Sequence, residues 1–491
     1  MARPVRGKAR RPSCPGGPSG RKPMRPSTQA HPPAREAGRS VTNEALTRAE
    51  DGAFLCGLRP DSRYAKATRN ALRLGRRVRA PRPSIWSGLR AGRPRMGARA
   101  PRSRSNAREA IRGRGLVATL ERILRLEPIA NLINQLARIN RTGRPPTYPP
   151  RVMVAVALAR VLFKAPCWTD ILELLREHSD LRRACGIQCA ALVPSRDACY
   201  RLTAKLRRVP LLAECGRRLV DLVAGRIPGF AHAVAADATH IEAYACASKT
   251  PPSDREARWG THHSGNGHDT RFFLGYKLHL MVDADHQIPI RWVVTPADVN
   301  EVERAIPLFD ETARRADWFR PQFAIMDRAY DAVGICRVLE AEHGCHPIIP
   351  QRLCGTSREP ALDGKGRPRC VHGPWIWKGT DYTHRRTKWV CPYENDPRVH
   401  EGPGCGRAGR GRRCWLSWRR DPRRHKLVPE GSGKFDKLYA KRVSVEREFS
   451  LLKQCFMLDT HRVRGLDRVA VHVNLCLVVR LATAALSLPA P

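Results

Sequence analysis

The chain has 491 residues, which is long enough for two or three domains with separate cores. Its 89 Lys and Arg residues outnumber its 45 Asp and Glu residues, and the net charge of +44 points to a polyanionic partner such as nucleic acid. A content of 42% hydrophobic residues excludes disorder throughout the chain. The 17 cysteines are not spaced as in a small secreted disulfide protein, so we expect reduced cytosolic thiols.

Residues 1–115 form a basic N-terminal stretch with 29 Lys and Arg against six Asp and Glu. Pro, Gly and Ser recur there and no apolar period persists, so we predict a disordered basic arm. Two interpretations stay open: the arm adds nonspecific DNA binding, or it is an upstream extension and the protein starts at Met96. No apolar segment follows the first charges, so we expect no secretory signal.

Residues 116–229 are predicted to form an all-helical DNA-binding domain. Apolar residues recur at helical spacing in 116–136, 152–163 and 171–181, and Ser195 is expected to cap a further helix. Short helices with tight turns and basic outer faces favour a helix-turn-helix that reads the major groove. The alternative is a structural bundle whose basic residues are merely solvated.

Residues 230–350 are predicted to form the first part of an α/β core, because segments with strand patterns are followed by helical ones. A capping box of Asn300 and Glu303 is expected to start a helix, and a second helix is expected over 333–343. The expected strands are 231–244, two within 275–300 that are joined by a turn at 283–287, 321–331 and 346–350.

Residues 351–436 interrupt this pattern with dense Gly, Pro and Arg, and we predict a β-rich insertion that contains cysteines. A hairpin is expected over 375–393, turning near residues 379–381. Its three tryptophans either pack within the hairpin or stack on a flipped base; they are Trp375, Trp377 and Trp389.

Residues 437–491 are predicted to complete the core with helices. A long helix is expected from about Phe435 to Met457, and a last apolar helix over 469–486. The last helix is interrupted by polar residues, which argues against a membrane span; these are His472, Asn474 and Arg480.

Two aspartates occupy strand positions that apolar residues normally fill. Asp237 lies in the middle of a predicted strand, and Asp327 ends the strand FAIMD. Carboxylates in such positions are costly unless a cation pairs with them, and acids on adjacent strands suit Mg²⁺ or Mn²⁺. Either aspartate alone is more often a structural residue that caps a loop.

A polar stripe on the helix after Phe435 adds a third acid. At about 100° per residue, Tyr439, Arg442, Glu446 and Lys453 project within a stripe about 60° wide, beside an apolar stripe. Glu448 projects about 160° away from Glu446, so we expect it on the far helix margin and dispensable for catalysis. Three carboxylates that hold two divalent ions suit phosphodiester cleavage. Arg442 and Lys453 are then expected to contact DNA phosphates, and Tyr439 the backbone or an end nucleotide.

The segment YAKRVSVEREFSLLK (439–453) resembles the Tyr-x2-Arg-x3-Glu-x6-Lys signature of bacterial insertion-sequence transposases of the DDE type. AADATHIEA (235–243) and FAIMDRAYD (323–331) are similar to the strands that carry the first and second Asp of that family, although Ala329 stands where relatives commonly have Gly. Residues 143–163 and 462–475 are similar to its N-terminal helical domain and its closing helix.

The resemblance implies a ribonuclease H-like catalytic fold, with the insertion between the second Asp and the Glu. It implies a DNA transposase that binds terminal inverted repeats, cuts at the element ends and joins the 3′ hydroxyl to target DNA. We expect a homodimer on double-stranded DNA in the bacterial cytoplasm, associated with the nucleoid, and no membrane partner. Two alternatives stay open: a nuclease of the same fold, and a catalytically inactive transposase-derived DNA-binding protein.

The insertion also offers soft metal ligands. Cys391-Pro followed by two spaced cysteines is similar to a zinc-binding knot of some relatives, which implies a structural Zn²⁺ site. Because no CxxC pair occurs there, free thiols in a β insertion remain the alternative. The candidate ligands are Cys370, Cys391, Cys405 and Cys414.

Overall fold

The computed structural model describes residues 115–139, 146–247, 251–263, 270–352, 362–371, 373–394 and 413–489. All of them belong to one compact unit, Pro81–Pro491. The predicted basic arm lies outside the described residues except for Gly115.

The described elements from Gly115 to Ala224 are all helical, as the periodicity predicts. The predicted cap is present, since the Ser195 Oγ accepts a hydrogen bond of 3.3 Å from the Ala198 N–H. Almost every residue of α4 is buried, as expected of a helix that is apolar on all sides. Apart from a helix over 115–124, the α-helices are α3 (Glu127–Ile139), α4 (Pro150–Leu162), α5 (Trp168–Glu177), α6 (Ser179–Ala184), α7 (Arg196–Arg208) and α8 (Leu211–Ala224).

A mixed sheet follows, in the order β4-β3-β1-β5-β6. The strands β1, β3 and β4 are antiparallel neighbours, whereas β5 and β6 run parallel to β1. An additional strand, β2, pairs with the first part of β3 and is absent from the predicted pattern. The strands are β1 (Ala233–Glu242), β2 (Arg258–His263), β3 (Thr270–Asp283), β4 (Ile288–Pro296), β5 (Phe323–Ile325) and β6 (His346–Ile348).

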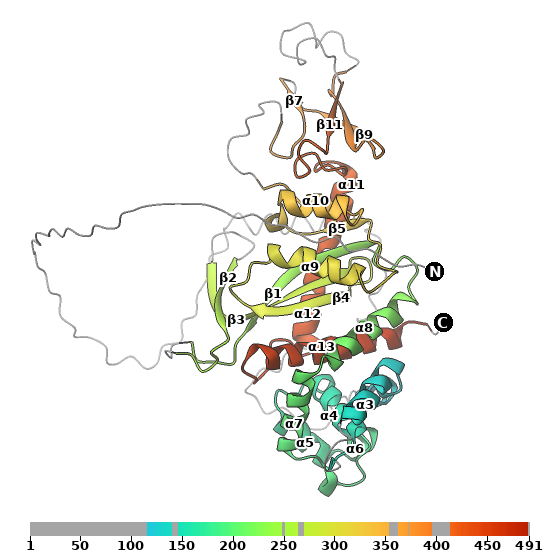
Figure 1. Ribbon diagram of the computed structural model, residues 1–491, viewed down its shortest axis with the longest axis vertical. Coiled ribbons are helices and arrows are strands. Elements are labelled where there is room, and N and C mark those ends of the chain that lie inside the picture. Colours follow the sequence, from blue (N-terminus) through green and yellow to red (C-terminus); the bar gives the residue numbers. More distant parts are fainter. Residues whose placement is uncertain are drawn as a thin grey trace, which may run out of the picture. The chain divides into compact units, whose positions relative to one another are not determined.

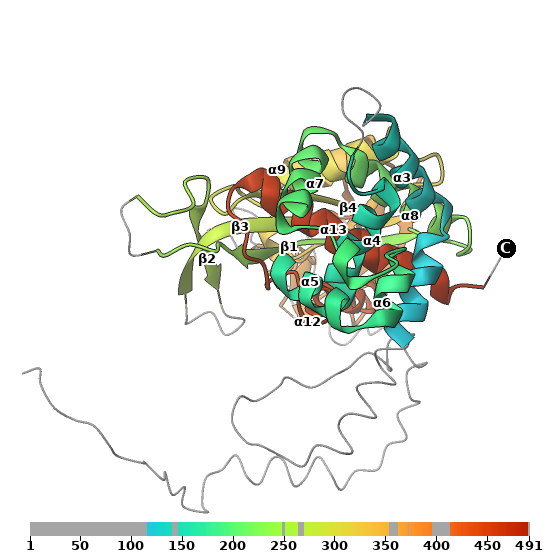
Figure 2. The same ribbon diagram turned by 90° about the horizontal axis from the view of Figure 1, so that it is seen from below.

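Helices cover both faces of this sheet. Figures 1 and 2 show α9 (Val302–Ala313) on one face, with α12 (Val443–Cys455) and α13 (Leu466–Ser487) on the other. The helix α10 (Val333–Ala341) contacts α9 and β6. The start of β1, Ala233–Ala236, is fully buried, and exposure begins at Asp237. Asp237 is therefore the first partly exposed residue of β1.

The start of α9 differs from the predicted capping box. The Asn300 side chain accepts a bond of 3.1 Å from the Val302 N–H, but the N-cap residue is Glu301, which makes no capping bond through its side chain. The Glu301 carboxylate instead pairs with Lys277 Nζ on β3 at 3.2 Å. The expected turn between β3 and β4 is present, and Asp283 accepts hydrogen bonds from the backbone N–H groups of Asp285 and His286.

The insertion contains a three-stranded sheet in the order β11-β10-β9 and a two-stranded ladder of β7 and β8. The hairpin turn lies at residues 382–385, after the predicted position, because β9 continues to Asp381, where the His384 N–H and the Arg386 side chain bind the carboxylate. The elements are β7 (Arg369–Cys370), β8 (Gly373–Pro374), β9 (Ile376–Asp381), β10 (Arg386–Val390) and β11 (Arg413–Ser417).

Tryptophans form the small core of the insertion. Trp375 and Trp389 are buried together with Cys391, and Trp377 packs against this cluster. Packing within the hairpin is thus the role that the structure gives these rings.

The expected long helix after the insertion is divided into three parts. Helix α11 (Gly433–Tyr439) begins at Ser432, whose Oγ accepts a bond from the Phe435 N–H. A 3-10 turn, η4 (Ala440–Arg442), links it to α12. Helix α13 is long and apolar enough to cross a membrane by composition, but 78% of its most apolar window is buried inside the protein, as in a core helix.

Candidate active site

The two predicted catalytic aspartates lie side by side, towards the C-terminal ends of β1 and β5. Ala235 of β1 pairs with Ile325 of β5 in parallel register. Asp237 follows two residues later within β1, whereas Asp327 lies two residues past the end of β5 and not at the end of the strand as predicted. The Asp237 Oδ1 accepts a bond of 2.8 Å from the Ala238 N–H. The Asp327 Oδ1 accepts a bond of 2.8 Å from the Ala329 N–H and thereby caps the 3-10 turn η2 (Arg328–Tyr330).

Arg442 joins the third predicted acid to this pair. Its Nη1 lies 3.1 Å from Asp237 Oδ2, and its Nη2 binds Glu446 Oε1. The Arg442 and Asp237 side chains are 23% and 17% exposed, whereas the Glu446 side chain is 49% exposed. Glu446 therefore reaches Asp237 through a guanidinium group, at the boundary between the core and solvent.

The electrostatics of Asp237 favour a bound cation. Burial raises the pKa of Asp237 to about 7, and the negative charges of Asp327 and Glu301 act in the same direction, against the Ala238 N–H and Arg442. Sequence reasoning missed Glu301, which no motif singled out. A carboxyl group that stays protonated up to neutral pH releases its proton when it binds a divalent cation.

The donor set fits Mg²⁺ or Mn²⁺ in chemistry, because carboxylate oxygens are the ligands that these cations prefer. The three acids do not converge, however: within the described part of the chain, no three His, Cys, Asp or Glu side chains are close enough together to hold a metal ion. Arg442 lies between Asp237 and Glu446. A metal bound by all three acids requires this guanidinium to move.

The two other predicted DNA-contacting residues have intramolecular partners. The Lys453 Nζ donates to the His240 carbonyl of β1 at 3.1 Å and pairs with Asp459 at 3.2 Å. The Tyr439 ring stacks on Phe435 with centroids 5.8 Å apart. Lys453 therefore attaches α12 to β1, a role that sequence spacing does not reveal.

The prediction that Glu448 lies on the helix margin is wrong. Glu448 is 1% exposed, and its carboxylate accepts bonds from Arg480 Nε at 2.8 Å and Arg480 Nη2 at 2.9 Å. Arg480 Nη2 also donates to the Gln287 carbonyl at 2.7 Å. The projection angle misled because α13 covers that side of α12 and supplies a buried arginine to it.

Three of the four predicted cysteine ligands lie in or beside the small core of the insertion. The Sγ atoms of Cys370 and Cys391 are 3.8 Å apart, and Cys414 packs against the cluster that contains Cys391. The fourth predicted ligand, Cys405, lies outside the described residues.

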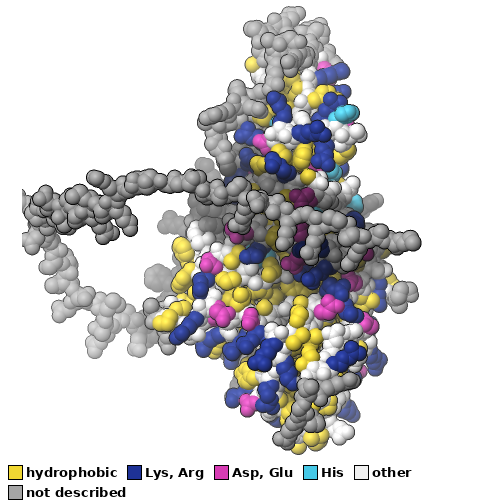
Figure 3. Space-filling model, in the orientation of Figure 1, with side chains coloured by type: hydrophobic (Ala, Val, Ile, Leu, Met, Phe, Trp, Pro, Cys, Tyr) yellow, Lys and Arg dark blue, Asp and Glu magenta, His cyan; other side chains and the backbone are white. Residues whose placement is uncertain are grey.

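Basic side chains are spread over the rest of the surface. Figure 3 shows Lys and Arg on the helical region and on the insertion. On α7, Arg201, Lys205 and Arg208 are exposed at a spacing that places them on one helix face. This stripe suits contact with a phosphate backbone.

An aromatic surface also continues the sheet face that carries Asp237. Asp237 pairs with Leu280 of β3, and counting back by twos along β3 places Phe272 on the same face, about 26 Å away. Trp259 of β2 lies beside it, opposite Leu274. Trp259 and Phe272 are 54% and 66% exposed. Their position depends on the unpredicted pairing of β2 with β3.

Comparison with known proteins shows the family to which the chain belongs. The family described as transposase DDE domain matches residues 228–482, more than half of the chain, and the family described as transposase domain (DUF772) matches residues 105–203. The chain therefore belongs to the transposases with a DDE domain, and the resemblance inferred from the sequence is confirmed at the level of the family.

The chain is also similar to one curated protein and to one solved structure. The chain is 32% identical over 100 residues to a putative transposase for insertion sequence element IS402 from Burkholderia cepacia, a match that covers 19% of this chain and 46% of the relative. The chain thus spans less than half the length of that relative. The structure of a piggyBac transposase synaptic complex with hairpin DNA is similar at 12% identity and a TM-score of 0.33, over 76% of this chain and 74% of that one.

Proposed function

We propose that this protein is a DNA transposase that binds the terminal inverted repeats of its element and catalyses metal-dependent DNA cleavage and strand transfer. The observation that carries the proposal is the parallel pairing of β1 and β5, which brings Asp237 beside Asp327, with Glu446 attached through Arg442. Membership of the transposase family supports the same function.

We infer that the catalytic core is ribonuclease H-like. Three antiparallel strands are followed by two parallel ones in the order β4-β3-β1-β5-β6, and the helix α12, which follows the insertion, packs on β1 and β3. The first acid lies on the central strand β1, and the second follows its parallel neighbour β5. Both acids therefore lie on the side of the sheet where these parallel strands end.

Asp237, Asp327 and Glu446 are the residues proposed to hold Mg²⁺ or Mn²⁺. When bound, the ions activate the attacking oxygen and stabilise the leaving oxygen of a phosphodiester. Arg442 pairs with both Asp237 and Glu446 in the metal-free protein. Once the carboxylates bind cations, its guanidinium is available to donate two hydrogen bonds to a DNA phosphate. Tyr439, the last residue of α11, and Lys453 of α12 extend the proposed DNA-contacting stripe on either side of Arg442.

The parts of the protein that contact DNA away from the active site are inferred from its basic and aromatic surfaces. The helical region is proposed to recognise the element ends through α7, while the sheet face with Trp259 and Phe272 contacts DNA beyond the cleaved bond. Bringing two ends together requires two active sites, so we propose a homodimer on double-stranded DNA. The location proposed is the bacterial cytoplasm, associated with the nucleoid.

We also propose that the insertion holds a structural Zn²⁺ ion through Cys370, Cys391, Cys405 and Cys414. Two thiolates bound tetrahedrally at about 2.3 Å from zinc lie about 3.8 Å apart, and Cys370 and Cys391 have this separation. Elemental analysis of the purified protein should find about one equivalent of zinc. A preparation without zinc that unfolds at the same temperature as a zinc-loaded one would remove this part of the proposal.

The test of the main proposal is strand cleavage of a labelled element end in Mg²⁺ or Mn²⁺. Asp237→Asn, Asp327→Asn and Glu446→Gln should each reduce cleavage by several orders of magnitude, while binding to the end persists, because catalysis here is mostly electrostatic. Binding without cleavage by the unaltered protein would indicate the inactive DNA-binding protein, and cleavage without joining would indicate a nuclease.

A further inference from the structure

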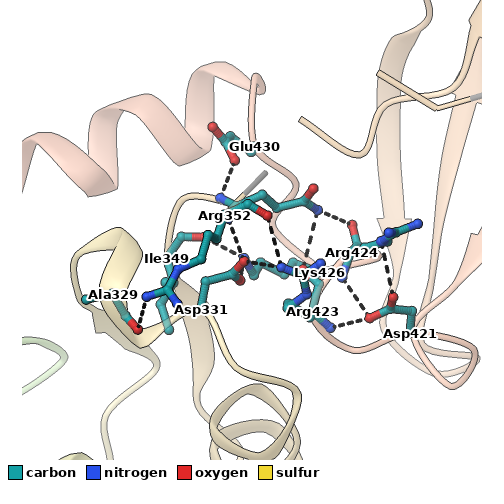
Figure 4. Close-up of polar contacts among 10 residues, drawn as sticks. Ala329, Asp331, Ile349, Arg352, Asp421, Arg423, Arg424, Lys426 and Glu430 are labelled. Carbon is teal, nitrogen blue, oxygen red and sulfur yellow. Dashed lines mark hydrogen bonds and ion pairs between the residues drawn. The ribbon is translucent and has the colours of Figure 1, made fainter. Parts of the chain in front are cut away.

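The insertion returns to the catalytic core through a buried charge cluster. Asp331 follows the second predicted catalytic aspartate by four residues, and its side chain is fully buried. Its Oδ1 accepts a bond of 3.1 Å from Lys426 Nζ, and its Oδ2 accepts bonds of 2.7 Å from Arg423 Nη1 and from the Arg352 N–H. Figure 4 shows these groups converging between the loop of residues 327–331, here called the catalytic loop, and residues 421–430 at the far end of the insertion.

The loop between Asp327 and Asp331 is bonded along its whole length. The Asp327 carboxylate accepts from the Ala329 N–H, and the Ala329 carbonyl accepts a bond of 3.0 Å from Arg352 Nη2. The Tyr330 N–H donates to the Asp327 carbonyl at 3.2 Å. A short 3-10 turn therefore fixes Asp327. Arg352 and the residues that donate hydrogen bonds to Asp331 fix the position of this turn.

The cations that surround Asp331 come from the far end of the insertion. Lys426 is 1% exposed and also donates to the Ile349 carbonyl at 2.5 Å, which fixes it between β6 and the catalytic loop. The entry and exit of the insertion are joined at the same place, because the Gln351 N–H donates to Glu430 and the Gln351 side chain donates to the Arg424 carbonyl. The catalytic loop thus depends on residues about ninety positions later in the chain.

Burying one carboxylate against two cations adds little net stability, because the cost of desolvation offsets the Coulomb attraction. A well-packed apolar contact would join the insertion to the core as strongly. What the charged cluster adds is a defined geometry, because each carboxylate oxygen has a directed donor. This geometry is transmitted to Asp327 through a turn of three residues.

We propose that Asp331, Lys426 and Arg423 form a positioning lock through which the insertion sets the position of the Asp327 carboxylate. The proposal rests on the cleavage activity proposed above. The three residues are positioning residues, because none of them reaches the reacting atoms. In this arrangement a displacement of the insertion changes the position of the Asp327 carboxylate.

The test compares Lys426→Met, Lys426→Arg and Arg352→Ala in the full chain, with Asp363→Asn as the matched control. Asp363 pairs with Arg367 inside the insertion at 2.7 Å and has no described bond to the catalytic loop. Misplacement of a catalytic group by about 1 Å costs about a hundredfold in rate. Lys426→Met should therefore lower the cleavage rate constant by about 30- to 100-fold and raise the Mn²⁺ concentration for half-maximal rate, with end binding within about threefold. Lys426→Arg should restore most of the rate.

A readout without metal or DNA separates positioning from simple stabilisation. In metal-free protein, amide hydrogen exchange of residues 327–331 should accelerate at least about tenfold in Lys426→Met, while exchange in β1 stays unchanged. Arg352→Ala removes an exposed side chain that binds Ala329, so it does not endanger folding. It should produce a weaker form of the same two effects, and it decides the question if Lys426→Met fails to fold.

The outcomes distinguish this proposal from the proposed function. If Asp327→Asn abolishes cleavage while Lys426→Met and Arg352→Ala both cleave within twofold of the unaltered protein, the lock is wrong and the transposase assignment stands. The lock is also wrong if Asp363→Asn lowers the rate as much as Lys426→Met does. If Asp327→Asn cleaves normally, the proposed function itself is wrong.

Discussion

Replacing Glu448 by Gln removes the negative charge of the buried ion pair between α12 and α13. Both side chains of the pair are 0% exposed, so water cannot replace the lost interaction with Arg480. Breaking a buried pair by removing one partner costs about 3–5 kcal/mol. Because Gln keeps the size of Glu and one oxygen acceptor, we expect a loss near 3 kcal/mol in the free energy of unfolding.

The assay is denaturant unfolding followed by tryptophan fluorescence, with Glu242→Gln as the control. Glu242 pairs with Arg271 on the surface, where the side chains are 55% and 73% exposed. The control should therefore lose less than about 1 kcal/mol. The double variant Glu448→Met and Arg480→Met should recover most of the loss, because an apolar replacement of a buried pair is often neutral.

The same variant separates stability from catalysis. Glu448→Gln should cleave within a few-fold of the unaltered protein at a temperature where it remains folded, because Glu448 points into the core and away from Asp237. If Glu448→Gln were no less stable than Glu242→Gln, the buried pair would not contribute as reasoned. If it were folded but inactive, Glu448 would have a role at the active site.

Further predictions concern charge, zinc and the aromatic surface. Because the pKa of Asp237 in the folded protein is raised to about 7, the metal-free native state binds a proton that the unfolded chain has lost, so its stability should fall as pH rises from about 4 to about 7. Asp237→Asn should reduce this slope in pH-dependent unfolding, and an unchanged slope would contradict the assignment. Chelation should lower the unfolding temperature of the insertion, and Cys391→Ser should make the protein insensitive to the chelator; equal sensitivity in both proteins would argue against zinc at this site. Trp259→Ala combined with Phe272→Ala should weaken binding to DNA that carries an unpaired extension of about eight nucleotides past the cleaved bond by about tenfold or more, but leave shorter DNA unaffected, as gel-shift titration can measure.

The positions of the acidic residues could be predicted from the sequence because they depend on local pattern. Asp237 lies within β1 as predicted, and Asp327 follows β5, which ends two residues earlier than predicted, at Ile325. Arg442 and Glu446 are four residues apart and face each other at the start of α12. Strand alternation and helical spacing act over a few residues, so they are visible without knowledge of the fold.

Tertiary structure alone decided which polar groups are buried together. Glu448 meets Arg480 from another helix, and Asp331 meets Lys426 and Arg423 from the far end of the insertion. The period of an element shows which of its faces is apolar, but it does not show which other element will cover a charged side chain. A charge near the margin of a helix is exposed or buried according to that neighbour, and for Glu448 the neighbour is α13.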